Sequence, residues 1–154
     1  MTEPRPHENS PAGAGYAGDI KPKEAWEVLL RDPGAQLIDV RTEAEWNFVG
    51  IPDLASQNRQ AILCEWQRFP PGPNPQFVQQ VEAALKEANY RKGAPLYFLC
   101  RSGGRSRAAA IAMTAAGFGP CFNVAEGFEG ALDAERHRGT AGGWKAENLP
   151  WIQF

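Results

Sequence analysis

Residues 97–112 read YFLCRSGGRSRAAAIA, and this stretch decides the fold. The apolar run PLYFL at 95–99 predicts a strand that ends at Cys100, and RSRAAAIAMTAA at 105–116 predicts a helix. A strand joined to a helix by a few residues is typical of an α/β domain, where ligands bind at the carboxyl ends of parallel strands. We therefore expect Cys100 to lie at the functional edge of a sheet.

The rest of the chain alternates in the same way. Helical spacing predicts helices at 22–32 and 75–90, and Thr42 with Glu45 forms the capping-box pattern of a short helix. Short apolar runs predict strands at 35–40, 61–66 and 121–124, and a last helix is expected from about Phe128 to Arg138. This order predicts an α/β fold with a mostly parallel central sheet of about five strands and helices on both faces.

The length of 154 residues fits one domain. Residues 1–18 are rich in Pro and Gly without periodicity, so we expect a disordered leader that is dispensable for folding, followed by one domain at 19–154. An insertion at about 52–75 includes the proline-rich RFPPGPNP. It is interpreted as a surface connection, with a lid or a partner-docking loop as the alternatives.

Composition excludes several classes of function. The net charge is -2, from 18 acidic and 16 basic residues, which argues against a general binder of nucleic acid or of membrane surfaces. No apolar stretch approaches the length of a membrane span, and the first residues do not resemble a signal peptide, so a cytoplasmic protein is expected. The three cysteines form no CxxC pair, so neither a disulfide framework nor a zinc site is expected.

The residues after Cys100 are of the kinds that bind an anion. A free thiol is mostly protonated at neutral pH, so a nucleophilic cysteine needs surroundings that favour the thiolate. Adjacent glycines let backbone N–H groups turn inward, and the start of a helix favours negative charge. Arg101, Arg105 and Arg107 add three positive charges within seven residues. We expect the anion to be bound by Arg101, Ser102, Gly103, Gly104 and Arg105.

Two other chemistries are not favoured. A cysteine protease would need His7 or His137 beside Cys100, and neither histidine has a catalytic neighbourhood in the sequence. A nucleotide-binding P-loop would need GxxxxGK[ST], and this segment contains no lysine. Cys64 and Cys121 lie in apolar runs and are expected to be structural.

CRSGGRS at 100–106, with LIDVRTEAEW at 37–46, resembles the single-domain rhodanese (thiosulfate sulfurtransferase) family. The resemblance extends to NVAEGFEG at 123–130 and GGWKAENLPW at 142–151. It implies a rhodanese-like domain in which Cys100 is the sulfur-accepting nucleophile and Asp39 and Arg41 support the site. Rhodaneses of this kind use a six-residue loop, here Cys100 to Arg105, whereas related phosphatases and arsenate reductases use a longer one.

Three features depart from the family pattern. FVGIPD at 48–53 has no histidine, Glu126 stands where a second glycine is common, and the insertion after Pro52 is long. These departures leave the substrate and the protein partner open.

The resemblance implies that a sulfane sulfur moves from thiosulfate or a similar small sulfur-containing anion, through a Cys100 persulfide, to a thiophilic acceptor. The acceptor would be cyanide, a thiol or a thioredoxin-like protein, with no cofactor and no metal. The alternatives are a phosphatase or arsenate reductase on the same fold, and a non-catalytic rhodanese-like module for protein interaction or sulfur sensing.

Overall fold

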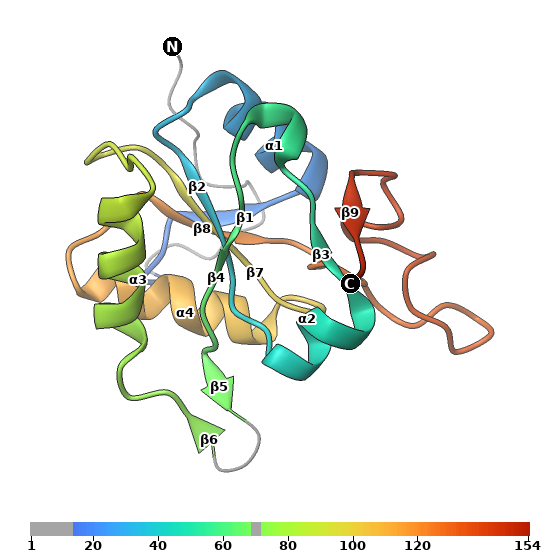
Figure 1. Ribbon diagram of the computed structural model, residues 1–154. Helices are drawn as coiled ribbons and strands as arrows, with labels where there is room; N and C mark the ends of the chain where they lie inside the picture. The colour runs from blue at the N-terminus through green and yellow to red at the C-terminus, as the bar shows by residue number, and fades with distance from the viewer. Residues whose placement is uncertain (1–13, 69–71) are drawn as a thin grey trace.

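The computed structural model describes residues 14–68 and 72–154 and is built on a five-stranded sheet (Figure 1). The strand order is β1-β8-β7-β2-β4, and every neighbouring pair is parallel. The strands are β1 (Gly18–Ile20), β2 (Gln36–Asp39), β4 (Ile62–Leu63), β7 (Leu96–Leu99) and β8 (Cys121–Val124). The predicted α/β fold with about five mostly parallel strands is confirmed.

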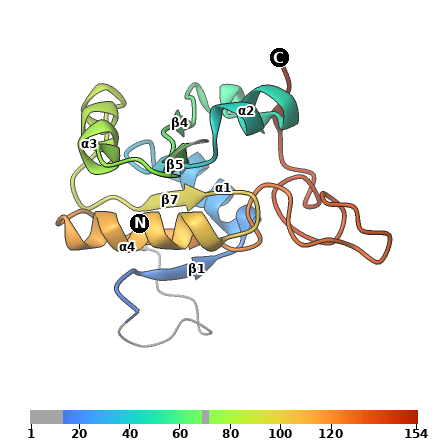
Figure 2. The ribbon, with the colours of Figure 1, turned by 90° about the horizontal axis from the view of Figure 1, so that it is seen from below.

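Helices cover both faces of the sheet because side chains alternate along each strand. Leu37 and Tyr97 point to one face, where they pack with Leu29 of α1 (Pro22–Arg31). Ile38 and Phe98 point to the other face, in one cluster with α3 (Phe77–Glu87) and α4 (Gly104–Ala115). Helix α4 lies beside β7 (Figures 1 and 2).

Smaller elements complete the domain. Helix α2 (Glu43–Val49) begins at the predicted capping box, in which the Thr42 hydroxyl accepts from the amide of Glu45. It leads to β3 (Ile51–Pro52), which pairs antiparallel with β9 (Trp151–Ile152), so the chain end lies beside α2 (Figure 1). No helix in the described ranges is both long enough and apolar enough to cross a membrane.

The predicted leader at 1–18 extends too far along the chain. Residues 1–13 lie outside the described part, but residues 14–18 are packed on the domain. Tyr16 and Ala17 contact the core clusters, and the Ala17 amide donates to the Cys121 carbonyl at 2.8 Å. Strand β1 then begins at Gly18 and forms one edge of the sheet. These residues escaped prediction because β1 is too short to show a period and depends on pairing with β8.

The predicted helix from Phe128 to Arg138 is wrong, because this segment forms turns and bends. Gly127 and Gly130 adopt φ values of +62° and +72°, which no helix continues. The Asp133 carboxylate then accepts from the amides of Glu135 and His137 and closes a turn. Local side-chain bonds of this kind compete with helix formation.

The described part of the insertion is not only a loop. It contains a 3-10 turn η1 (Ala55–Gln57), the edge strand β4, and a two-stranded pair of β5 (Gln67–Arg68) with β6 (Gly72–Pro73). Asn74 joins this pair to α3, because its amide nitrogen donates to the Glu65 carbonyl at 2.9 Å and to Gln80 Oε1 at 2.8 Å. The insertion therefore supplies the fifth strand of the sheet.

Candidate functional site

Cys100 follows directly on β7, at the carboxyl end of the parallel sheet. Its side chain is almost fully buried, with 1% of the residue exposed. Its Sγ accepts hydrogen bonds from the Gly103 amide and from the Ser106 hydroxyl, both at 3.1 Å. Gly103 makes the first bond with a φ of +122°, a backbone conformation that favours glycine.

The segment at 126–130 holds the carbonyl groups of the active loop, residues 100–105. The Cys100 carbonyl accepts from the Phe128 amide at 2.8 Å, and the Arg101 carbonyl accepts from the Glu129 and Gly130 amides at 3.0 and 3.2 Å. A Cβ added at Gly127 would lie 2.4 Å from the Cys100 oxygen. Only glycine therefore allows this close approach, in which the segment binds the Cys100 and Arg101 carbonyls.

The start of α4 adds a field that favours negative charge at Cys100. The first amides of a helix have no acceptor within the helix, and its N-terminus carries a partial positive charge. Helix α4 is 12 residues long and begins at Gly104, four residues after Cys100. The active loop and the helix start therefore favour negative charge at the sulfur.

Arg105 does not extend freely into this site. Its guanidinium binds Glu45 on α2 in a bidentate pair, with N–O distances of 2.6 and 3.0 Å. Burial alone would raise the pKa of Glu45, but the hydrogen bonds and the charge of Arg105 outweigh it, so this pKa lies below its usual value. Sequence reasoning identified Glu45 only as a capping residue and missed this ion pair.

The other predicted loop residues divide by exposure. Arg101, Ser102 and Gly104 are exposed at the mouth of the loop, whereas Gly103 is buried below them. Arg107 lies outside the loop, and its guanidinium faces the Asp19 carboxylate at 3.9 Å. Arg101 and Ser102 are therefore the predicted loop residues whose side chains are exposed.

Asp39 and Arg41 form a fully buried ion pair, with Nη2 to Oδ2 at 2.6 Å and Nε to Oδ1 at 2.9 Å. Arg41 also donates to the Gly50 carbonyl at 2.8 Å, and its guanidinium lies 4.2 Å from the centre of the Phe128 ring. Because the Phe128 amide binds the Cys100 carbonyl, this pair supports the segment that holds the active loop.

Ser106, Asn123 and Asp19 form a polar group behind the sulfur that the sequence did not predict. The Ser106 hydroxyl lies 2.5 Å from Asn123 Oδ1, and Asn123 Nδ2 donates to Asp19 Oδ1 at 3.0 Å. Ser106 and Asn123 are both buried. A single asparagine within the apolar strand CFNV was the signal that could have found them, because a buried amide requires partners.

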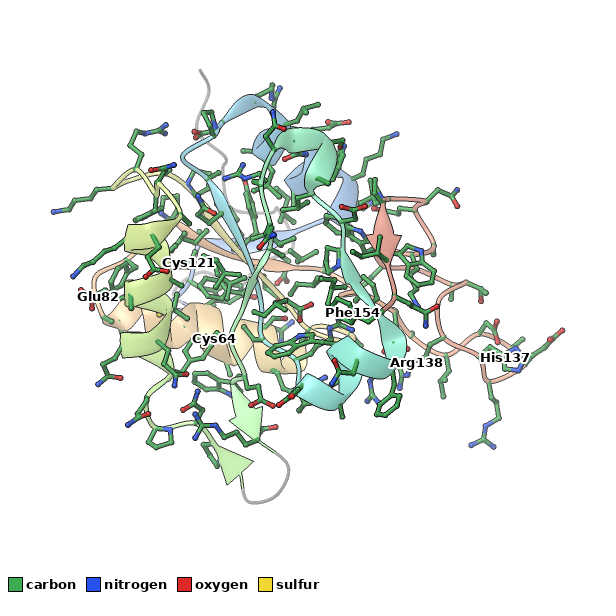
Figure 3. All side chains as sticks on the ribbon, in the orientation of Figure 1. Cys64, Glu82, Cys121, His137, Arg138 and Phe154 are labelled. Atoms are coloured by element: carbon green, nitrogen blue, oxygen red, sulfur yellow. The ribbon has the colours of Figure 1, made fainter. Side chains whose placement is uncertain are left out.

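The remaining candidates lie apart from this chemistry. Burial raises the pKa of Cys64 and of Cys121 to about 11, so both thiols stay protonated at neutral pH (Figure 3 shows both inside the fold). His137 is exposed on an outlying loop at the right of Figure 3, and His7 lies outside the described residues. No group of three or more His, Cys, Asp or Glu residues in the described ranges could hold a metal ion.

Comparisons with known proteins show the family of the chain. A family model described as STR4 middle domain matches residues 18–154. The chain is 38% identical over 128 residues to the uncharacterized protein RC0915 of Rickettsia conorii, covering 83% of this chain and 91% of that protein. It is 27% identical to the chloroplastic protein THYLAKOID RHODANESE-LIKE of Oryza sativa subsp. indica, covering 87% of this chain but 25% of that longer protein.

Solved structures show the same fold. The crystal structure of Rv0390 from M. tuberculosis is 49% identical, with a TM-score of 0.81 over 90% of this chain and 99% of that one. The solution structure of the polysulfide-sulfur transferase homodimer from Wolinella succinogenes matches with a TM-score of 0.53 at 21% identity, over 88% of this chain and 78% of that one. The chain therefore belongs to the STR4 middle-domain family, and its fold is that of a rhodanese-like domain.

Proposed function

We propose that this domain is a sulfurtransferase that takes a sulfane sulfur from thiosulfate or a similar small anion and carries it as a persulfide on Cys100. The observation that carries the proposal is the surrounding of the Cys100 sulfur. Hydrogen-bond donors and a helix start converge on Sγ, while the nearby carbonyls of Cys100 and Arg101 are bound by the 126–130 segment. Such a site stabilises negative charge on sulfur both before and after transfer.

In the first half-reaction the Cys100 thiolate attacks the outer sulfur of thiosulfate. A bond forms between Sγ and the outer sulfur, the S–S bond of the donor breaks, and sulfite leaves with the electron pair. The outer sulfur keeps the negative charge that it carries in thiosulfate, and sulfite takes up the charge that the thiolate loses, so no proton moves and no general base is required. The outer sulfur then lies where the exposed amides of the loop and of the first turn of α4 can stabilise it.

The burial of Cys100 supports a small donor. Because only 1% of the residue is exposed, we expect a donor to approach Sγ at the mouth of the short active loop and to reach it with a single atom. A terminal sulfur can enter this mouth end-on, whereas a phosphate or arsenate must bring its central atom to Sγ with the oxygens around it. The six-residue loop therefore favours sulfur over the phosphatase or arsenate reductase alternative.

In the second half-reaction an acceptor removes the outer sulfur and restores the thiolate. Cyanide, a low-molecular-weight thiol and a thioredoxin-like protein can all attack the outer sulfur, with Cys100 as the leaving group. The steady-state reaction with thiosulfate and cyanide then yields sulfite and thiocyanate.

Parallel assays test this function. We expect thiocyanate from thiosulfate and cyanide but no phosphate release from a generic phosphate ester at the same protein concentration. Cys100→Ser should abolish thiocyanate production, while Cys64→Ser, which changes a thiol outside the loop, should keep it. Phosphate release that depends on Cys100, without sulfur transfer, would support the alternative chemistry instead.

A further inference from the structure

The Ser106 hydroxyl lies at a branch point behind the reacting sulfur. Its Oγ is 3.1 Å from Cys100 Sγ, 2.5 Å from Asn123 Oδ1 and 3.3 Å from the Gly103 carbonyl oxygen. A hydroxyl has one proton, so it donates to only one of these acceptors at a time. Because Ser106 is fully buried, these three protein acceptors compete for its one proton.

The orientation of Asn123 is fixed from its other side. Its Nδ2 donates to Asp19 Oδ1 at 3.0 Å, and a carboxylate only accepts. The amide oxygen of Asn123 must therefore face Ser106. Tyr16 also donates to Asp19 Oδ1 at 3.0 Å, and Arg107 lies 3.9 Å from Oδ2, so the carboxylate is itself held in place.

We propose that Ser106 is a catalytic residue whose O–H group rotates between two acceptors, Asn123 Oδ1 and Cys100 Sγ, as the charge on Sγ changes. Asn123 and Asp19 are its positioning residues. This inference rests on the proposed sulfur transfer and assigns the residues that control the second half-reaction. When Sγ is a thiolate, Ser106 donates to it. When Sγ is the neutral inner sulfur of the persulfide, the hydroxyl donates to Asn123.

The hydrogen bond from Ser106 to Sγ has its largest effect on the rate when the acceptor removes the outer sulfur. Cyanide attacks the outer sulfur, the bond between the outer sulfur and Sγ breaks, and its electron pair stays on Sγ. Negative charge grows on Sγ during this step, and the Ser106 proton turns toward it. The hydrogen bond therefore assists the leaving group in discharge, whereas it stabilises the attacking thiolate and so slows the uptake of sulfur by a fully ionised Cys100.

The size of the effect follows from one hydrogen bond to a charged atom. Such a bond changes an equilibrium by about 10- to 100-fold. About half of this effect, on a logarithmic scale, is felt in the transition state of thiol exchange. For Ser106→Ala we expect discharge by cyanide to be about 3- to 10-fold slower, and uptake on the high-pH plateau to be faster by a similar factor.

Asn123→Leu should act in the opposite direction. It removes the acceptor that competes for the Ser106 proton while keeping a side chain of similar size, so Ser106 donates to Sγ more persistently. Discharge should become faster and uptake slower. Opposite effects of two neighbouring substitutions on the same step are not produced by a loss of packing, which would impair both variants in both half-reactions.

Single-turnover measurements test the inference. Uptake is followed by sulfite release after mixing with thiosulfate, and discharge by thiocyanate after mixing the purified persulfide with cyanide. Thr114→Val is the matched control, because it removes another hydroxyl of α4, one that donates to the Ala110 carbonyl two turns beyond Ser106. This control should leave both rates unchanged.

A second readout does not depend on sulfur transfer. Alkylation of Cys100 by iodoacetamide at neutral pH should be about threefold slower in Ser106→Ala, since this variant lacks the hydroxyl that donates to the reactive sulfur. If the wild-type protein forms no persulfide but the alkylation rates change as expected, the proposed function fails, and only the hydrogen bond from Ser106 to the Cys100 thiolate is supported. If the wild-type protein transfers sulfur but Ser106→Ala discharges and alkylates at wild-type rates, the role of Ser106 is refuted.

Discussion

The ion pair between Glu45 and Arg105 joins α2 to the start of α4 and offers a direct test of how the active loop is held. The change is Glu45→Gln, which keeps the length of the side chain and an oxygen for the capping bond from the Thr42 amide, now 3.2 Å from Oε1. It removes the charge from a bidentate contact with Arg105. The variant therefore separates the ion pair from the helix cap.

The loss of stability expected for Glu45→Gln follows from the geometry and exposure of the ion pair. Hydrogen bonds to charged groups contribute about 1.5–3 kcal/mol when buried, and exposed ion pairs about 0.2–1 kcal/mol. The two side chains are 22% and 21% exposed, so we expect Glu45→Gln to lower the free energy of unfolding by about 1–2 kcal/mol. For a domain of this size that corresponds to a fall in Tm of about 2–8 °C.

The free energy of unfolding lost in Glu45→Gln should depend on pH, because Arg105 lowers the pKa of Glu45 in the folded protein. A carboxyl group with a lowered folded pKa contributes its stability above its unfolded pKa of about 4.3 and loses it as the pH falls through the folded value. The difference between wild type and Glu45→Gln should therefore be full at neutral pH and shrink below about pH 4.3. Urea unfolding at several pH values measures it.

The matched control is Glu82→Gln on α3. Glu82 lies 4.0 Å from Lys86, and these side chains are 47% and 77% exposed. The free energy of unfolding lost in Glu82→Gln should therefore stay below about 0.5 kcal/mol. If Glu45→Gln were as stable as Glu82→Gln at neutral pH, or if its loss did not change with pH, the ion pair would not hold the loop.

Two further predictions concern the thiols and the glycine beneath the loop. Iodoacetamide at neutral pH should label Cys100 in the folded protein but not Cys64 or Cys121, whose pKa values of about 11 keep them protonated; peptide mass mapping checks this, and equal labelling of all three would contradict it. Gly127→Ala should cost more than about 3 kcal/mol of unfolding free energy, because its Cβ meets the Cys100 carbonyl. Gly139→Ala, also at positive φ but near only Lys145 Cδ at 3.8 Å, should cost about 1 kcal/mol, and denaturant unfolding that gave equal losses would exclude the clash.

The parts of the fold that the sequence predicted are those with a strong local pattern. The strand before Cys100 and the helix after it were found because an apolar run and an alanine-rich segment meet at two glycines. The capping box at Thr42 and Glu45 is likewise a local signal. The error at 128–138 arose because helical spacing there is overridden by Gly127 and Gly130 at positive φ.

The parts that escaped prediction depend on residues far apart in the chain. Glu45 and Arg105 are 60 residues apart, and Asn123 and Asp19 are 104 apart, so no local pattern links them. Asp19 and Asn123 meet because the order of the parallel strands brings β1 beside β8, whereas Glu45 and Arg105 meet where α2 lies near the start of α4. The sequence placed Cys100 at the carboxyl end of a strand and the loop before a helix, as the structure has them, but the groups that orient the loop required the tertiary structure.

Intact-mass measurement of the purified protein after incubation with thiosulfate is the most direct test of persulfide chemistry at Cys100. We expect a gain of about 32 Da, the mass of one sulfur atom, which cyanide removes as thiocyanate and which is absent in Cys100→Ser. A wild-type protein that gains no mass from thiosulfate or another sulfane donor, or a Cys100→Ser variant that still gains it, would contradict the proposed function.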